Sequence, residues 1–212
     1  MTGFQQPSEF ARAVDALRKD LLSEDGPQIS TVRNYNFAIL PYDPADEFPL
    51  RRAINDLCEK LRDEGWNTAT IPLHALLLER LRAQGPEIVE ALVAREKRLE
   101  RATDPWRGLN ALKERVVTLI EGPDGLAADV IREIQAVLAR QSGGADRTVI
   151  FLGRAGALYP FFRTSALLKH VAGHTNNVPV VLLYPGKLVG ETGLSFMGVL
   201  PADRDYRPRI YR

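Results

Sequence analysis

Two arginines flank an apolar turn in the segment RTVIFLGRAGALYPFFRTS, which spans residues 147–165. The β-branched and aromatic run at 149–151 predicts a buried strand, and Gly153 ends this strand before a loop and a short helix. In open α/β sheets, ligand and partner sites usually lie at the carboxyl ends of the strands. Arg154 and Arg163 can therefore bind acidic groups there, because guanidinium groups pair well with carboxylates.

Two further segments are expected to reach the same edge of the sheet. The runs NFAILPY at 36–42 and PVVLLY at 179–184 predict strands, and the second is apolar throughout, as in a strand buried on both faces. If both are parallel to the strand at 148–152, their carboxyl ends meet near a topological switch point. Asp43 can then form an ion pair with Arg154, which creates either a binding site or a rigid cluster of loops. The residues expected around this pair are Tyr159, Arg163 and Tyr184.

The loop after Gly153 lacks the main features of a nucleotide site. A P-loop ends in Gly-Lys-Ser/Thr directly before a helix, and GRAGALYPFFRTS has no such ending. The backbone N–H groups of residues 155–157 could still hold an anion beside Arg154. Because the fingerprint glycines and a ribose-binding acid are missing, a tight turn is favoured over a nucleotide site.

Nucleophilic catalysis finds little support in the sequence. Ser165 follows a strand and a turn, but the Gly-x-Ser-x-Gly pattern of a nucleophile elbow is absent. Thr164 and Ser165 are better explained as N-caps of the following helix. Cys58, the single cysteine, lies on an apolar helix face and is expected in the core. We therefore predict no catalytic residue.

Two groups of residues resemble metal ligands only in part. His170 and His174 are four residues apart, a spacing that can present two ligands on one helix face, but Gly173 is expected to end the helix between them. The acidic cluster at 43–47 could form a two-carboxylate metal or acid/base site. However, acids in such turns usually accept hydrogen bonds from backbone N–H groups, and His74 is expected to pack against its own helix. We therefore predict no metal site and no cofactor.

The C-terminal segment YRPRIYR, residues 206–212, combines cations with aromatic rings. This composition can stack on nucleic-acid bases or bind an acidic protein surface. Arg207, Arg209 and Tyr211 are therefore candidates for a partner surface, with packing of the tail back onto the sheet as the alternative. The charged helix at 86–102 is expected to be solvated, although its arginines could also form an interaction surface.

The composition is that of an ordinary globular protein. The 212 residues are 45% hydrophobic and 26% charged, with a net charge of +1, so direct DNA binding would need a local basic patch. The single cysteine excludes an internal disulfide and suits a reducing cytosol. Neither a signal peptide nor an apolar stretch of the ~20 residues that span a membrane is evident. We therefore predict a cytoplasmic protein.

Strand and helix patterns alternate at both ends of the chain, and a long helical stretch separates them. The predicted helices cover 8–22, 49–64, 74–84, 86–102, 104–120, 126–140 and 165–172. The predicted strands cover 36–42, 66–73, 148–152, 179–184 and 195–200. The fifth strand should be antiparallel to the fourth, because their connection is too short for a crossover. The sequence thus predicts one α/β domain over 1–212, with three layers, a mainly parallel Rossmann-like sheet and a helical insert at about 74–142.

Three segments together form a distinctive pattern. They are RNYNFAILPYDPADEFPLRR at 33–52, RTVIFLGRAGALYPFFRTSALL at 147–168, and VPVVLLYPGKLVGETGLSFMGVL…YRPRIY at 178–211. In these segments the chain closely resembles the BrxB family of BREX phage-defence systems. The resemblance implies a cytoplasmic component of a complex that distinguishes methylated host DNA from phage DNA. Its implied partners are a PglZ-like protein, the PglX methyltransferase and a large ATPase.

The resemblance implies a non-catalytic adaptor that binds chiefly to the PglZ-like protein and has no cofactor. One alternative is a degenerate nucleotide- or phosphate-binding protein that uses the edge with Asp43 and Arg154. Another is a subunit that contacts DNA through the tail and the charged helix, in which case binding should depend strongly on salt.

Overall fold

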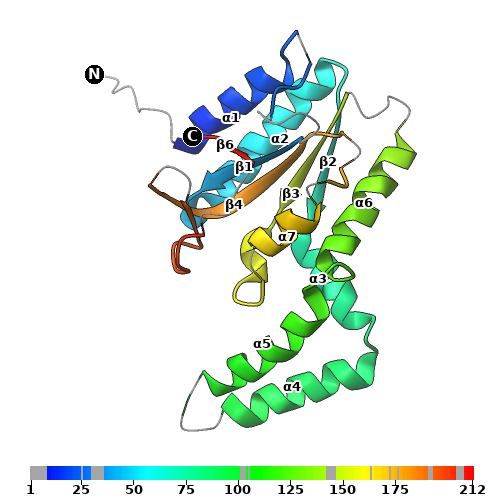
Figure 1. The fold of residues 1–212 in the computed structure, drawn as a ribbon, viewed down its shortest axis with the longest axis vertical. Coiled ribbons are helices and arrows are strands. Elements are labelled where there is room, and N and C mark those ends of the chain that lie inside the picture. Colours follow the sequence, from blue (N-terminus) through cyan, green and yellow to red (C-terminus); the bar gives the residue numbers. More distant parts are fainter. Residues whose placement is uncertain are drawn as a thin grey trace.

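The computed structural model describes residues 9–24, 26–29, 36–100, 104, 106–141, 147–162, 164–171, 173–175, 177–190, 193–203 and 208–212. In this part of the chain, a mainly parallel sheet lies between two layers of helices (Figure 1). The predicted three-layer α/β fold is confirmed.

The sheet is built from both ends of the chain. Its strands are β1 (Phe37–Tyr42), β2 (Asn67–Pro72), β3 (Thr148–Gly153), β4 (Val180–Val189) and β6 (Arg209–Ile210). They lie in the order β2-β3-β4-β1-β6, and every neighbouring pair is parallel. Strand β5 (Gly193–Phe196) pairs antiparallel with the second half of β4, as predicted.

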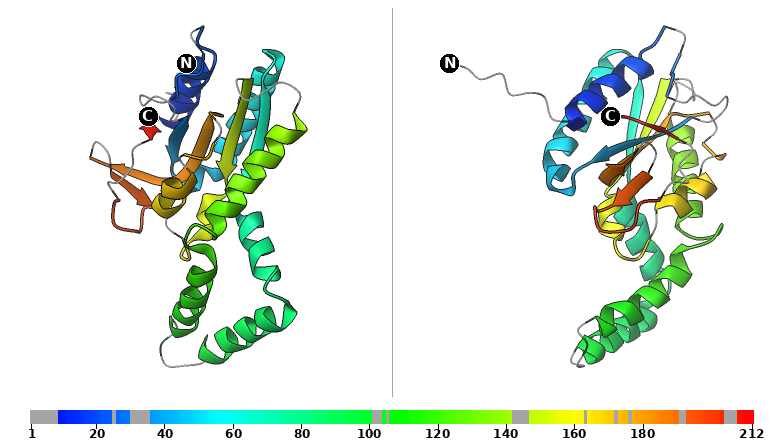
Figure 2. Two further views of the ribbon diagram at one scale, coloured as in Figure 1. Left: turned by 45° about the vertical axis from the view of Figure 1, so that its right-hand side comes forward. Right: turned by 60° about the vertical axis from the view of Figure 1, so that its left-hand side comes forward.

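Helices cover both faces of this sheet. On one face lie α1 (Glu9–Leu21) and α2 (Glu47–Asp63), and on the other lie α3 (Leu73–Arg82), α6 (Leu126–Arg140) and α7 (Thr164–Val171) (Figure 2). Side chains alternate along β1, so that Ala38 and Leu40 face the first layer while Phe37 and Ile39 face the second. The two resulting cores bury the central strands on both sides, which explains their continuous apolar runs.

Two helices of the insert form an arm that projects from the sheet. They are α4 (Pro86–Glu100) and α5 (Arg107–Ile120), which pack on each other beyond the end of the sheet (Figures 1 and 2). We call this pair the helical arm. The sequence predicted both helices but not their projection away from the domain.

The predicted boundaries are wrong at two strands. Strand β4 continues to Val189, beyond the predicted end at Tyr184, because β5 pairs with its second half. Strand β5 ends at Phe196 and not at Leu200, since Met197 and Gly198 have φ values of 56° and 67°. Such left-handed backbone cannot continue a strand.

Candidate functional site

The carboxyl ends of β1, β3 and β4 meet at one edge of the sheet, as the sequence predicted. Strand β4 is parallel to both β1 and β3 and lies between them. The loops that follow these strands include the 3-10 helices η1 (Pro44–Asp46) and η3 (Ala155–Leu158). We call this edge the rim; Asp43 and Arg154 both lie on it.

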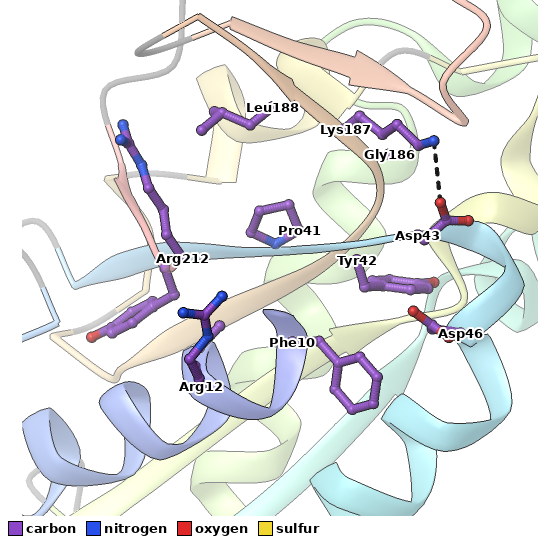
Figure 3. Close-up of a pocket in the computed structure, with 12 residues that line it drawn as sticks. Phe10, Arg12, Pro41, Tyr42, Asp43, Asp46, Gly186, Lys187, Leu188 and Arg212 are labelled. Carbon is purple, nitrogen blue, oxygen red and sulfur yellow. Dashed lines mark ion pairs between the residues drawn. The ribbon is translucent and has the colours of Figure 1, made fainter. Parts of the chain in front are cut away.

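The predicted ion pair between Asp43 and Arg154 is wrong. Arg154 pairs with Glu47, with 3.6 Å between Nη1 and Oε1. Asp43 pairs instead with Lys187, with 3.3 Å between Oδ2 and Nζ, and Figure 3 shows this second pair. The Asp43 carboxylate also caps η1 by accepting from the backbone N–H of Ala45 at 3.0 Å. These contacts hold the pKa of Asp43 below its usual range, chiefly through the backbone hydrogen bond.

Glu47 is the carboxylate that joins Arg154 to the end of β1. The hydroxyl of Tyr42 donates a hydrogen bond to Glu47 from the other side. Tyr42 is buried, and this burial, followed by the bond to Glu47, raises its pKa far above the usual value. The sequence placed Glu47 in an acidic turn, but its position in the first turn of α2 is what brings it to Arg154.

The end of β1 separates two hollows on the rim. The outer hollow, of about 740 Å³, lies between α1, β1 and β4 (Figure 3). Its lining includes Phe10, Arg12, Pro41, Asp43, Asp46, Lys187, Tyr211 and Arg212. The inner hollow, of about 390 Å³, lies between α2 and the ends of β2 and β3. Its lining includes Glu47, Leu50, Arg51, Ile54, Asn55, Thr70, Pro72, His74, Arg154 and Leu183. Tyr42 lines both hollows.

The remaining rim candidates have different surroundings. Tyr184 is fully buried, donates to the carbonyl of Leu194 at 3.3 Å and packs edge-on against Phe196, so its position is that of a core residue. Tyr159 is 37% exposed and its ring centroid lies 6.5 Å from that of Phe196. Tyr159 is thus accessible at the rim, whereas Arg163 lies outside the described residues.

The C-terminal tail packs back onto the sheet and α1. Tyr211 is 2% exposed and donates to Asp20 at 2.9 Å, while Arg209 binds the same carboxylate at 2.7 Å. The Arg209 guanidinium also lies 4.9 Å from the centroid of the Tyr211 ring. The prediction of Tyr211 as partner surface is therefore wrong, and Tyr211 follows the alternative of packing back onto the sheet, since it belongs to the core beside α1. Arg207 lies outside the described residues.

Tyr42 and Tyr211 make the protein sensitive to alkaline pH. Burial, and then a hydrogen bond to a carboxylate, raises the pKa of both phenols above the ordinary value of 10.0. Above pH 10 the unfolded chain loses these protons while the folded chain keeps them, so the free energy of unfolding falls as pH rises. We expect each tyrosine to account for about 1.4 kcal/mol per pH unit there.

Urea unfolding of the wild type, Tyr42→Phe and Tyr211→Phe between pH 8 and 11 measures this effect. Each variant should lose part of the wild-type decline above pH 10, because phenylalanine carries no proton to release. Equal slopes in all three proteins would contradict the assignment.

The other chemical candidates have structural roles. Nδ1 of His174 lies 3.0 Å from the carbonyl oxygen of His170, and no group of three potential metal ligands occurs among the described residues. Cys58 is buried in the core, where burial raises the pKa of its thiol. Thr164 and Ser165 are the first two residues of α7, so neither precedes the helix as its N-cap, and that prediction is wrong.

The helical arm exposes large apolar side chains. Ile88 and Val93 on α4 are 44% and 46% exposed, and Trp106 at the tip is 65% exposed. A hollow of about 500 Å³ between the two helices is also lined by charged residues. These charged residues are Arg95, Arg98, Asp104, Arg107 and Glu114. The sequence indicated the arginines of the charged helix at 86–102, which is α4, as a candidate interaction surface. It gave no signal for Trp106.

A family model described as "BREX protein BrxB" matches residues 69–210, from β2 through the arm to β6. The chain belongs to the BrxB family. It is therefore a component of a BREX phage-defence system. Neither a curated protein nor a solved structure matches the chain significantly. Among the described residues, none of the helices is both long and apolar enough to cross a membrane.

Proposed function

We propose that this BrxB-family protein is a non-catalytic, cytoplasmic adaptor whose helical arm binds the PglZ-like protein of its BREX system. The observation that supports this proposal is the arm itself, a pair of helices that projects from the α/β domain and exposes apolar side chains. Through PglZ the adaptor would connect to the methyltransferase and the ATPase of the same system.

The packing of α4 supports a role in binding. Its apolar side chains Val89, Leu92 and Leu99 are only half-buried, and no described side chain of α4 is fully buried. Ile88 and Val93 are left exposed on the remainder of the helix. A helix needs one apolar stripe to pack against its partner, so apolar residues outside that stripe suit a second partner.

The tip of the arm suggests the chemistry of that partner. Trp106 offers a large side chain of the type that dominates binding energy at protein interfaces. Arg95, Arg98 and Arg107 form no ion pair with another described residue. The partner surface should therefore combine an apolar pocket with carboxylates, because both features complement the arm.

Co-purification tests this proposal. The wild-type chain, co-expressed with the PglZ-like protein of its own gene neighbourhood, should retain that protein. A triple variant, Ile88→Ser, Val93→Ser and Trp106→Ala, should bind it at least about tenfold more weakly, as expected from the loss of central apolar anchors.

A matched control uses apolar residues that are at least as exposed but lie off the arm. Phe48→Ser and Val199→Ser remove two side chains that are each 69% exposed, and this double variant should bind like the wild type. If the triple variant kept its helical content and bound the PglZ-like protein as tightly as the wild type, the binding surface would lie elsewhere than on the arm. ATP or AMP turnover by the purified chain would contradict the non-catalytic role.

A further inference from the structure

The inner hollow has the position and the walls of a small-molecule site. It lies where β2 and β3 end, the region in which parallel α/β sheets hold their ligands. Leu50, Ile54 and Leu183 give it an apolar wall. Its volume of about 390 Å³ falls within the range of ligand pockets.

A buried polar atom in this hollow lacks a partner. His74 lines the hollow, and its buried Nδ1 forms no hydrogen bond with any described residue. Burying a polar atom without a hydrogen bond is unfavourable, but an atom that is closed to solvent is also closed to a ligand in the hollow. His74 can therefore contact such a ligand only through the rest of its ring. Arg51, Asn55 and Thr70 also line it, and among the described residues none of the three has a hydrogen bond or an ion pair.

The charges in the hollow favour an anion. Arg51 and Arg154 contribute two guanidinium groups against the single carboxylate of Glu47, which pairs with Arg154 and accepts from Tyr42. Arg51 is therefore the cation that no described carboxylate balances. Arg154 also has a φ of 62°, and non-glycine residues held in the left-handed region occur frequently at ligand sites.

The outer hollow is larger but less suited to an anion. Its Lys187 is neutralised by Asp43, and the carboxylate of Asp46 also lines it (Figure 3). Arg212 has an interaction within the protein as well. Arg12 also lines the outer hollow, but Asp46 is a carboxylate that forms no ion pair with a described residue, whereas the single carboxylate of the inner hollow, Glu47, is already paired with Arg154.

We propose that the inner hollow binds a phosphate group through Arg51, Arg154 and His74, with Asn55 and Thr70 as additional polar contacts. Guanidinium groups recognise phosphate oxygens through paired hydrogen bonds, which makes arginine the typical phosphate ligand. The apolar wall beside these groups suits the remainder of an organic phosphate. This site is independent of the arm, so it does not depend on the proposed adaptor function.

The full chain can be tested by thermal denaturation and calorimetry with two probes, AMP and inorganic phosphate. A ligand that binds only the folded state raises the melting temperature. We expect Arg51→Gln and His74→Gln each to weaken binding by about tenfold or more, because each removes a contact to a charged group. Arg52→Gln, on the next residue of α2 and outside the hollow, should leave the affinity unchanged within about twofold.

The two probes distinguish the source of the phosphate. Tighter binding of AMP would assign the site to an organic phosphate, and equal binding would assign it to free phosphate. No shift with either probe at millimolar concentration would overturn the proposal. The same shift in Arg51→Gln as in the wild type would also overturn it, and circular dichroism verifies that each variant is folded.

Discussion

Replacing Arg80 by alanine should lower the free energy of unfolding by about 3 kcal/mol, the lower end of the usual cost of breaking a buried ion pair. Arg80 on α3 binds Asp129 on α6 at 2.5 Å, and both side chains are at least four-fifths buried. Its guanidinium also donates to the carbonyls of Leu119, Asp124 and Gly125 at 3.3, 2.8 and 2.8 Å. The substitution removes one of the two arginines that bind the Asp129 carboxylate, since Arg132 binds it as well, and leaves three carbonyl oxygens without this donor.

Urea unfolding measures this loss, and hydrogen exchange localises it. Because one of the three carbonyls belongs to the last turn of α5 and the other two follow its end, the variant should also exchange faster at the base of the arm. Arg82→Ala, on the same helix at an exposed position, should change the free energy of unfolding by less than about 0.5 kcal/mol. A loss below about 1 kcal/mol in Arg80→Ala would show that the ion pair contributes little net stability.

The Arg80 cluster illustrates what the sequence could not predict. Arg80 lies in a helix with a second arginine, Arg82, and nothing in its local pattern marks it as buried. Its partner Asp129 is 49 residues away, and the contact depends on how α3 packs against α6. Periodicity predicts which face of a helix is apolar, but it does not predict which polar side chain closes the junction between two helices.

At the rim, too, the sequence predicted which residues lie near one another but not which of them form ion pairs. Continuous apolar runs predicted β3 and β4, and parallel order then placed Asp43 and Arg154 at one edge. The ion pairs were not predictable, because they depend on the extension of β4 to Lys187 and on the first turn of α2 at Glu47. Strand β6 has only two residues, too few for a periodic signal, so the structural role of Tyr211 was not evident either.

Gly186→Ala should destabilise the protein by about 3 kcal/mol, the upper end of the usual cost of overpacking. Gly186 lies in β4 opposite Phe196 of β5. A Cβ atom there would lie 2.2 Å from the carbonyl oxygen of Ser195 and 2.6 Å from Cε1 of Tyr184. The first neighbour is backbone and the second belongs to a fully buried ring, so neither can move without separating β5 from β4.

Two other glycines provide graded controls for this prediction. Gly173→Ala meets no atom within 4 Å and should change the free energy of unfolding by less than about 0.5 kcal/mol. Gly156→Ala meets the flexible side chain of Met197 at 3.2 Å, so its effect should be intermediate. Urea unfolding of the three variants measures their free energies of unfolding and so ranks the cost of each substitution. If Gly186→Ala were as stable as Gly173→Ala, the close pairing of β4 with β5 beside the rim would be contradicted, and with it the position of Lys187 opposite Asp43.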